Sequence, residues 1–296
     1  MFQKPAADEI DAENPSGADP DSPGFRAFLA LERQASPDAS EAALERALLR
    51  ALPKGAKLAH ASEEAYPSAF HALEDPPEAV AWMGDMGLAE RQSLIAIVGS
   101  RDAAPERRAA AAALASELAA RGTVIVSGMA AGIDRAAHCG ALSAALRGDK
   151  KACGRTIAVL GTPLDVPYPP ENRDIWERIR CTGLLLSEAP QLAGRRFSPE
   201  ERAASLRRRN RLVAALGLGS LVMAARPGSS TLIEARRSLS LGHPVLIWHE
   251  AADEDWAKAL LAEHLQDSEG SPLTMVVSSA AEADEALSPW RRVWWL

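Results

Sequence analysis

Short apolar runs alternate with longer stretches of helical periodicity from residue 93 onward. Each run is rich in β-branched residues or leucine on both faces, as strands buried in a parallel sheet require. This alternation is typical of repeated βαβ units, so we expect an α/β fold with a mostly parallel sheet and helices on both faces. The expected strands are 94–100, 123–128, 156–161, 183–188, 220–225, 244–249 and 274–279, and the expected helices are 104–121, 133–147, 171–180, 201–216, 231–241, 255–265 and 280–287.

The N-terminal third of the chain carries weaker patterns. Residues 1–25 combine Pro, Gly, Ser, Asp and Ala with few large apolar groups, which predicts a disordered acidic tail. Residues 26–90 are expected to form a separate extension. Apolar residues at helical spacing between 25 and 52, interrupted by a Ser-Pro-Asp turn, predict two short helices, and residues 63–86 are expected to be rich in loops. The main domain is then expected over 91–296.

Charge is unevenly distributed along the chain. The net charge is −7, but residues 1–25 carry six acids and one base, and residues 250–296 carry ten acids and three bases. Residues 26–249 therefore hold 29 bases and 24 acids, so the middle of the chain is mildly basic. Its densest cationic stretch is 195–211, with seven arginines and two glutamates, and a polyanionic partner is expected there.

Composition excludes several classes of protein. With 296 residues, 47% of them apolar, the chain has the size of one large or two small globular domains and is not mostly disordered. It contains no apolar run of about 20 residues and no secretion signal, which predicts a soluble cytoplasmic protein with no membrane partner. Three cysteines without CxxC spacing and six histidines without ligand spacing indicate no disulfide framework, metal site or cofactor.

Several expected strands end in glycine or hydroxyl-bearing residues. In an open α/β sheet the ligand site lies beyond the carboxyl ends of the strands, where glycine lets the backbone approach a phosphate and helix N-termini supply N–H donors. One such loop would be ordinary turn geometry, but four loops favour a shared phosphate site. The residues expected to line it are Gly99, Ser100, Arg101, Ser127, Gly128, Gly132, Ser229, Ser230 and Thr231.

Asp134 and His138 stand four residues apart at the start of an expected helix and share one of its faces. A catalytic pair is conceivable from this spacing. We favour a structural interpretation, in which Asp134 caps the helix and His138 is satisfied by a neighbouring carbonyl, because no nucleophile stands beside them.

Longer motifs appear in order along the chain. They include IAIVGSR (95–101), SGMAAGIDRAAHCGAL (127–142), TIAVLGTPLDVPYPPEN (156–172) and RRRNRLVAALG (207–217). Over roughly residues 65–250 the chain resembles the DprA/Smf family of DNA-processing proteins. The resemblance implies an extended Rossmann-like, doubly wound domain without enzymatic activity that binds and protects single-stranded DNA. It further implies a homodimer that helps to load a RecA-type recombinase during natural transformation.

The resemblance also implies which residues contact DNA. In the family, the arginine of GSR, the basic residue before TIAVLG and the RNR segment line the DNA pocket. These roles fall on Arg101, Arg155, Arg209, Asn210 and Arg211. Arginine forks suit phosphate oxygens. For each arginine alone a solvated surface charge is the more common role, but together with the motif the binding role is favoured. Asp165, in the LDVPYPPEN segment, is expected to accept backbone N–H groups in a turn.

Three departures from the family pattern fall near this pocket. Leu206-Arg207 replaces Phe-Pro, Ala224 stands where glutamate is usual, and Glu234 stands where a hydroxyl is usual. Pro227-Gly228-Ser229-Ser230-Thr231 with Glu234 resembles a contracted form of the PGGxGTxxE loop of LOG-type phosphoribohydrolases. That likeness leaves open a nucleotide hydrolase or a nucleotide sensor that uses Glu234. The simpler interpretation is an acid in the first turn of a helix, where it interacts favourably with the helix dipole.

The C-terminal segment 251–296 lacks the basic helix-turn-helix pattern of a DNA-binding winged helix. It is expected instead to add a helix, a strand and a second helix that close the main domain. Three tryptophans fall within the last seven residues, and we expect them to pack on the domain or to contact a partner.

Overall fold

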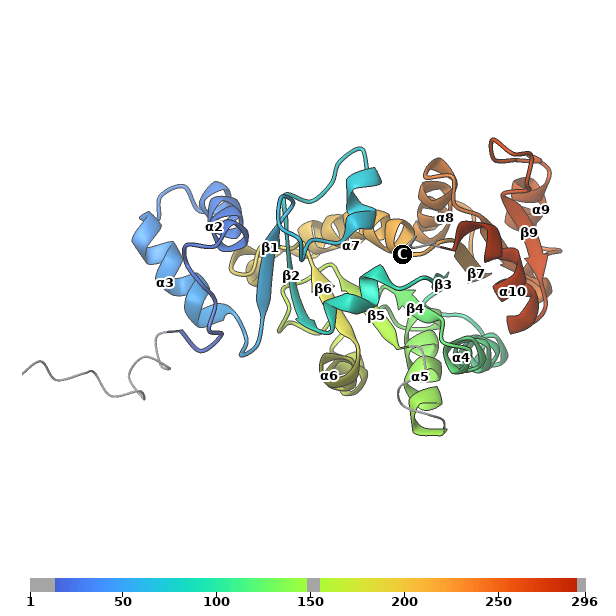
Figure 1. Cartoon of the computed structure of the whole chain (residues 1–296), viewed down its shortest axis with the longest axis horizontal. Helices are drawn as coiled ribbons and strands as arrows, with labels where there is room; N and C mark the ends of the chain where they lie inside the picture. The colour runs from blue at the N-terminus through green and yellow to red at the C-terminus, as the bar shows by residue number, and fades with distance from the viewer. Residues whose placement is uncertain (1–13, 148–154, 292–296) are drawn as a thin grey trace, which may run out of the picture.

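The structure is a computed structural model that describes residues 14–147 and 155–291. Within that part of the chain, nine strands form one sheet in the order β1-β2-β6-β5-β4-β3-β7-β8-β9 (Figure 1). None of the helices in these residues is long and apolar enough to cross a membrane. The strands are β1 Lys57–His60, β2 Ala79–Gly84, β3 Leu94–Gly99, β4 Val124–Ser127, β5 Thr156–Leu160, β6 Leu184–Ser187, β7 Ser220–Ala224, β8 Val245–Trp248 and β9 Thr274–Val277.

Helices connect most of these strands. The α-helices are α2 Pro23–Ala35, α3 Glu41–Ala51, α4 Pro105–Ala120, α5 Ile133–Arg147, α6 Arg173–Thr182, α7 Pro199–Leu216, α8 Ser230–Ser240, α9 Asp255–Leu261 and α10 Ala280–Ala286. The short 3₁₀ helices are η1 Ser68–Ala72, η2 Met86–Glu90, η3 Pro170–Asn172, η4 Ala193–Arg196, η5 His249–Ala251 and η6 Ser288–Trp290.

Seven adjacent strands of the sheet, β6-β5-β4-β3-β7-β8-β9, run parallel to one another. The chain proceeds from β3 through β4 and β5 to β6 on one side, and then returns through α7 to β7 on the other side of β3. The strand order therefore reverses between β3 and β7. This arrangement confirms the predicted α/β fold with a doubly wound, mostly parallel sheet, and all seven predicted strands are present within two residues of their expected ends.

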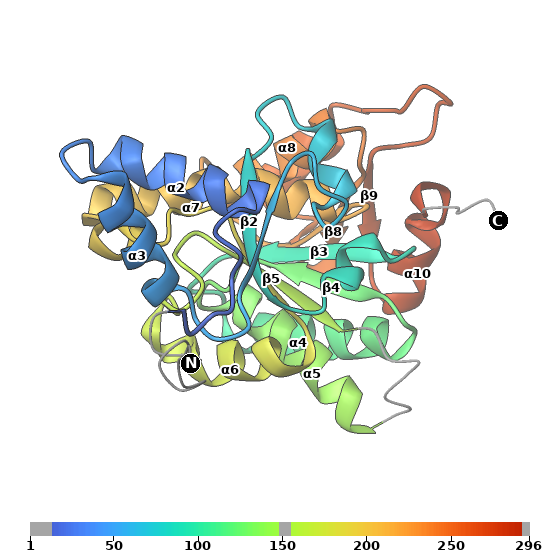
Figure 2. The same cartoon turned by 60° about the vertical axis from the view of Figure 1, so that its left-hand side comes forward.

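Helices cover both faces of the sheet (Figures 1 and 2). Side chains of successive strand residues point to opposite faces. In β3, Ile95 and Ile97 pack with α4 and α5, whereas Ala96 and Val98 pack with α7 on the other face. Because both sets are buried, the strands have no polar face, which explains the continuous apolar runs of the sequence.

The sequence prediction missed two strands: β1, for which it named no element, and β2, which lies within the residues 63–86 that it expected to be rich in loops. Strand β2 runs antiparallel to β6 and carries β1 on its outer edge, so the segment belongs to the main sheet. Its sequence, AVAWMG, has one β-branched residue and follows two prolines. The weak strand propensity is outweighed by burial, because Ala79 to Met83 are all buried between helices and neighbouring strands.

The N-terminal helices pack against the edge of the sheet that carries β1 (Figure 1). Helix α2 begins at Pro23 after a Ser22 N-cap, and Phe25 and Phe28 are fully buried. The predicted tail therefore ends earlier than residue 25, and residues 1–13 lie outside the described part of the chain. Glu32, which is 1% exposed, accepts the N–H groups of residues 192 and 193, so α2 also holds the segment that leads into α7.

The C-terminal part of the chain contains the predicted strand and helices as β9, α9 and α10. Trp290 donates its indole N–H to the carbonyl of Gly242 at 2.9 Å, so this tryptophan packs back on the domain. The other two predicted tryptophan contacts, at residues 294 and 295, lie outside the described residues.

Candidate functional site

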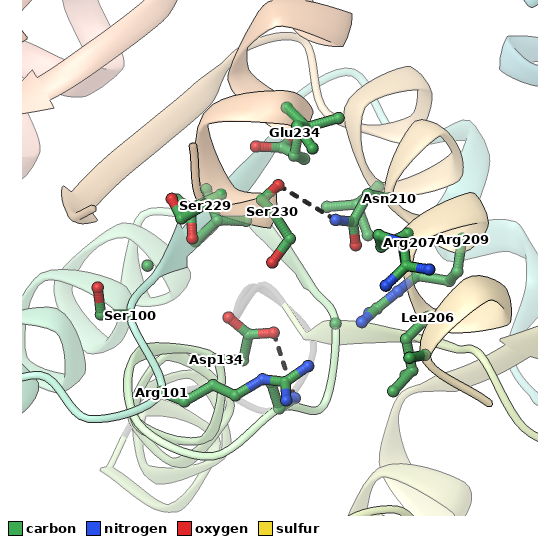
Figure 3. A pocket seen from close by; sticks show the side chains of 18 of the residues that line it. Ser100, Arg101, Asp134, Leu206, Arg207, Arg209, Asn210, Ser229, Ser230 and Glu234 are labelled. Atoms are coloured by element: carbon green, nitrogen blue, oxygen red, sulfur yellow. Dashed lines mark hydrogen bonds between the residues drawn. The ribbon is translucent and has the colours of Figure 1, made fainter. Parts of the chain in front are cut away.

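A hollow of about 680 Å³ lies at the carboxyl ends of β3, β4 and β7 (Figure 3). This is the place where the strand order reverses, and open α/β sheets bind their ligands there. Helices α5, α7 and α8 complete its walls. The sequence-predicted residues that line it are Gly99, Ser100, Arg101, Gly128, Asp134, Arg209, Asn210, Ser229, Ser230, Thr231 and Glu234.

Arginines line the hollow from three directions. Arg101 follows β3 and extends toward α7 (Figure 3), Arg202, Arg207 and Arg209 come from α7, and Arg226 follows β7. Arg226 is paired with Asp102. In the part of the chain that the structure describes, the exposed Arg101 and Arg207 form no ion pair within 4 Å. Both guanidinium groups are thus available to an anion in the hollow.

Arg209 forms the back wall and is only 4% exposed. Its Nη1 donates to the carbonyl oxygen of Val159 at 2.7 Å. A side chain at Gly128 would place its Cβ 1.9 Å from this Nη1, so the guanidinium occupies the space that glycine leaves open. Burial lowers the pKa of Arg209, and the negative charge of Asp134 opposes that effect.

Asp134 is the second residue of α5, and its carboxyl group lies near Arg101 and Arg209 (Figure 3). Its Oδ2 accepts the N–H of Ala130 at 3.2 Å, a contact that stabilises the turn before the helix. Burial raises the pKa of the Asp134 carboxyl, whereas the two arginines lower it. The aspartate therefore places a carboxyl group close to the two arginines, inside the wall of the hollow.

His138 is fully buried and does not line the hollow. The hydroxyl of Thr156 donates to the Ile125 carbonyl at 2.7 Å, so it accepts the Nδ1–H of His138, also at 2.7 Å. The partner is a hydroxyl and not the expected carbonyl. Burial lowers the pKa of His138 to about 3, which keeps the ring neutral between α5 and β5.

Ser127 and Gly132 shape the loops without reaching the hollow. The Ser127 hydroxyl is buried and donates to the Ile97 carbonyl at 2.7 Å, so it joins β4 to β3. Gly132 has a φ of +76°, and a Cβ there would lie 2.4 Å from the carbonyl oxygen of Ser100. Neither residue belongs to the lining of the hollow, so their predicted contact with a phosphate stays a prediction that the geometry does not favour.

The N-terminus of α8 faces the hollow. Ser229 is the N-cap residue, and Ser230 and Thr231 form the first turn. Asn210 of α7 donates its side-chain N–H to the Ser230 carbonyl at 3.2 Å, which fixes the two helices beside each other (Figure 3). A helix N-terminus carries partial positive charge, so this wall also favours an anion.

Glu234 lies at the floor of the hollow, on the second turn of α8, and is 2% exposed. The expectation of a first-turn acid that interacts with the helix dipole was therefore wrong. Its Oε1 accepts the Ser220 hydroxyl at 2.7 Å, and its Oε2 has no hydrogen-bond partner among the described residues. Burial raises the pKa of Glu234 to about 8, so the carboxyl holds its proton at neutral pH.

Two arginines predicted to line the pocket lie elsewhere. The Arg211 side chain is 3% exposed and is bound by Glu188, at 2.8 Å, and by Asp75, at 3.1 Å. Arg155 precedes β5 at the opposite, amino edge of the parallel strands and pairs with Asp85 at 3.0 Å. Neither side chain lines the hollow, because ion pairs hold Arg211 and because Arg155 lies at the opposite edge of the sheet, so a contact of either residue with DNA stays a prediction.

Asp165 also has an unexpected partner. Its Oδ2 lies 2.8 Å from Nη1 of Arg195, so the carboxylate forms an ion pair and not the predicted backbone contacts. The Thr162 hydroxyl closes the turn by donating to the Val166 carbonyl at 2.6 Å. The contacts of Asp165 thus tie the loop after β5 to η4.

Sequence reasoning missed Arg202 as a lining residue. It noted Arg207 only as a departure from the family pattern, included Arg226 only as part of the loop that follows β7, and did not commit to a role for Tyr168. The sequence did contain a signal for the arginines of α7, because most of the cationic stretch 195–211 falls on this helix. The residues of α7 that line the hollow recur at helical spacing, as one face of a helix requires. They are Pro199, Arg202, Ala203, Leu206, Arg207, Arg209, Asn210 and Val213.

Comparison with known proteins agrees with this architecture. The chain is 38% identical over 174 residues to Protein Smf of Synechocystis, and 32% identical over 186 residues to DNA processing protein DprA of Bacillus subtilis. These matches cover 58% and 62% of this chain, and 40% and 57% of the respective relatives. The chain thus spans about half the length of the curated relatives that it matches.

Two solved structures share the fold. DNA processing protein A from Helicobacter pylori, whose single-stranded DNA binding mode has been described, is 27% identical, with a TM-score of 0.62 over 79% of this chain and 97% of that one. DprA from Streptococcus pneumoniae is 24% identical, with a TM-score of 0.65 over 99% and 100% of the two chains. A sequence model of the DNA recombination-mediator protein A family matches residues 57–268. The chain therefore belongs to the DNA recombination-mediator protein A family.

Proposed function

We propose that this protein is a non-enzymatic DNA-processing protein that binds single-stranded DNA in the hollow between β3, α7 and α8. The observation that carries the proposal is the pair of exposed arginines, Arg101 and Arg207, which face the hollow from two elements without an acidic partner within 4 Å in the described chain. Buried Arg209 adds a third positive charge behind them.

The chemistry of a DNA strand fits these groups. Single strands are held by cationic grooves that follow the phosphates, and arginine forks match phosphate oxygens. The N-terminus of α8, with Ser229 and Ser230, offers further donors for a phosphate. The acidic net charge of the chain does not oppose binding, because the acids cluster near the two ends of the sequence.

The relatives suggest the cellular role. By analogy with their DNA processing function, we propose that the bound strand is protected and passed to a RecA-type recombinase in the cytoplasm during natural transformation. We also propose that the protein acts as a homodimer. Light scattering of the purified protein would test the dimer, and recombinase filament assembly on strands coated by this protein would test the transfer.

The binding proposal is tested by titrating a fluorescent single-stranded oligonucleotide at several salt concentrations, with duplex DNA and a nucleoside monophosphate as competitors. We expect affinity that falls linearly with salt on logarithmic axes and that favours the single strand. The Arg101→Glu variant should bind at least tenfold more weakly at low salt, since one contact is lost and one repulsion is added. Arg46→Glu, an exposed site on α3, is the matched control. Unchanged affinity in Arg101→Glu would refute the proposed site.

Glu234 supports a second candidate function. A protonated carboxyl at the floor of a nucleotide-sized hollow has the pKa, about 8, of a general acid at neutral pH. Such a group could cleave the N-glycosidic bond of a nucleoside monophosphate, or the hollow could sense the nucleotide without cleavage. Release of free base by the wild type but not by Glu234→Gln would support the hydrolase, and no release by the wild type would dismiss it. Displacement of DNA by low concentrations of the monophosphate would support the sensor.

A further inference from the structure

One wall of the hollow carries an aromatic ring beside a guanidinium group. Tyr168 lies in the loop after β5, and Arg202 lies in the first turns of α7. The Cζ atom of Arg202 stands 5.0 Å from the centre of the Tyr168 ring, within the range of a cation–π contact. Both side chains line the hollow, and Tyr168 is the only aromatic residue among its lining residues in the described chain.

Neighbouring contacts hold this pair in place. Arg202 donates from Nη2 to the carbonyl oxygen of Phe197 at 3.2 Å, and its Nε is buried without a hydrogen-bond partner among the described residues. The loop that carries Tyr168 is tied by the contact between Thr162 and Val166 and by the ion pair of Asp165 with Arg195. The ring and the guanidinium are therefore fixed before any ligand arrives, which reduces the entropy lost on binding.

The arginines of the hollow account for phosphate binding but not for the bases of a strand. An unpaired base exposes both of its flat faces, and such faces stack on aromatic rings and on guanidinium planes. We propose that Tyr168 and Arg202 form a stacking platform for one unpaired base, while Arg101 and Arg207 contact the adjoining phosphates. This inference rests on the proposed function and names the part of the strand that the wall recognises.

The platform has consequences for selectivity. Every base has a π-face, so stacking tolerates any sequence. A base inside a duplex is already stacked and paired and cannot reach the wall without being unstacked, so the platform favours single strands over duplexes. The platform also makes the protein bind a normal strand more tightly than an abasic strand of equal length and charge. The arginines alone would bind the two strands equally well.

The test compares an oligothymidine with an abasic oligonucleotide of the same length and phosphate number. We expect the wild type to prefer the oligothymidine by roughly 5- to 150-fold, the range for stacking of one base. Tyr168→Ala should lose this preference and retain its affinity for the abasic strand. Tyr168→Phe should behave as the wild type, because the ring face is preserved. Arg202→Ala should reduce the preference in part.

The outcomes separate this inference from the proposed function. Failure of the wild type to bind either strand would overturn the proposed function. Equal binding of both strands by the wild type, or an equal loss for both in Tyr168→Ala, would overturn the platform alone. A strand carrying 2-aminopurine provides an independent measurement on the wild type, because its fluorescence falls when the base stacks. Unchanged fluorescence for every probe position at saturating protein would also overturn the platform.

Discussion

The two faces of helix α7 carry the same residue type in opposite settings. On the face toward the hollow, Arg207 is exposed and has no acidic partner within 4 Å in the described chain. On the other face, Arg211 is buried and bound by Glu188 and Asp75, and Arg208 lies 3.8 Å from the same glutamate. The arginines of this stretch therefore do not all present their guanidinium groups to the hollow.

The difference comes from what the neighbouring elements present. Glu188 follows β6 and Asp75 precedes β2. Both contact the face of α7 that points away from the hollow, which we call the far face. An arginine held by two carboxylates has its donors occupied, so a phosphate would have to displace a buried ion pair. The face of α7 toward the hollow, which we call the near face, lies opposite glycines, serine hydroxyls and the N-terminus of α8. These groups leave the guanidinium groups of the near face available to a ligand.

The largest expected effect follows from breaking the buried pair. Arg211→Ala should lower the free energy of unfolding by about 3 to 5 kcal/mol, because it leaves the buried Glu188 carboxylate without its main partner. Denaturant unfolding measures the loss. The double variant Arg211→Met with Glu188→Leu should recover most of the stability, since it removes both charges. A loss below about 1 kcal/mol for Arg211→Ala would show that the far face is not a stabilising ion pair.

The next effect concerns Glu234, at the floor of the hollow, and the dependence of stability on pH. The pKa of Glu234 is raised to about 8, whereas in the unfolded chain it has the ordinary value of 4.5. The folded state therefore holds a proton that the unfolded state releases between pH 4.5 and 8, so this contribution to stability is complete below pH 4.5 and is lost as pH rises toward 8. The decline is at most about 1.4 kcal/mol per pH unit.

Glu234→Gln isolates this contribution, because glutamine is neutral at every pH. Unfolding measured from pH 4.5 to 8 should show a shallower decline in the variant than in the wild type. Asp134 faces Glu234 from α5 and also has a raised pKa, so it supplies a decline of the same sign in both proteins, and Arg209 faces it from α7. Identical pH profiles would mean that Glu234 ionises normally in the folded protein.

A smaller effect is expected from the near face itself. Arg207→Ala should weaken binding of single-stranded DNA about five- to tenfold at low salt and reduce the slope of the logarithmic salt dependence by about 0.7, the value for one phosphate contact on a single strand. Its unfolding free energy should change by less than about 0.5 kcal/mol, since the side chain is exposed. An unaltered salt slope would remove Arg207 from the binding surface.

Arg208→Ala should have the smallest effect and is the matched control for Arg207→Ala. The Arg208 side chain is 63% exposed, and its contact with Glu188 is long, at 3.8 Å. An exposed ion pair of this kind contributes little, so unfolding should shift by less than about 0.5 kcal/mol. DNA affinity should stay within about twofold of the wild type. A loss equal to that of Arg207→Ala would erase the distinction between the two faces.

The parallel part of the sheet could be predicted because its strands are buried on both faces. Runs such as LIAIVGS bury their side chains against a helix layer on each face of the sheet, so every position is apolar or small. Strands β1 and β2 gave no such signal. They lie at the edge of the sheet, and β2 is stabilised by its pairing with β6 and by burial, which act between residues about 100 positions apart.

The location of the candidate site was predictable, together with most of the loop residues that line it. Glycine and serine at the ends of β3, β4 and β7 mark the carboxyl edge of the sheet, and the hollow lies there. Which side chains enter it depended on packing. Ser127 turns toward Ile97, Glu234 turns inward to Ser220, and Arg155 falls at the opposite edge.

The sequence by itself determined the α/β class, the seven parallel strands and the edge of the sheet where the hollow lies, because these depend on local periodicity and on strand ends. Only the tertiary structure decided the fate of each charge. A charged side chain responds to acids, carbonyls and solvent brought near it from distant parts of the chain, as the contrast of Arg207 with Arg211 shows. Periodicity is a property of a segment, whereas the partner of a charge is a property of the fold.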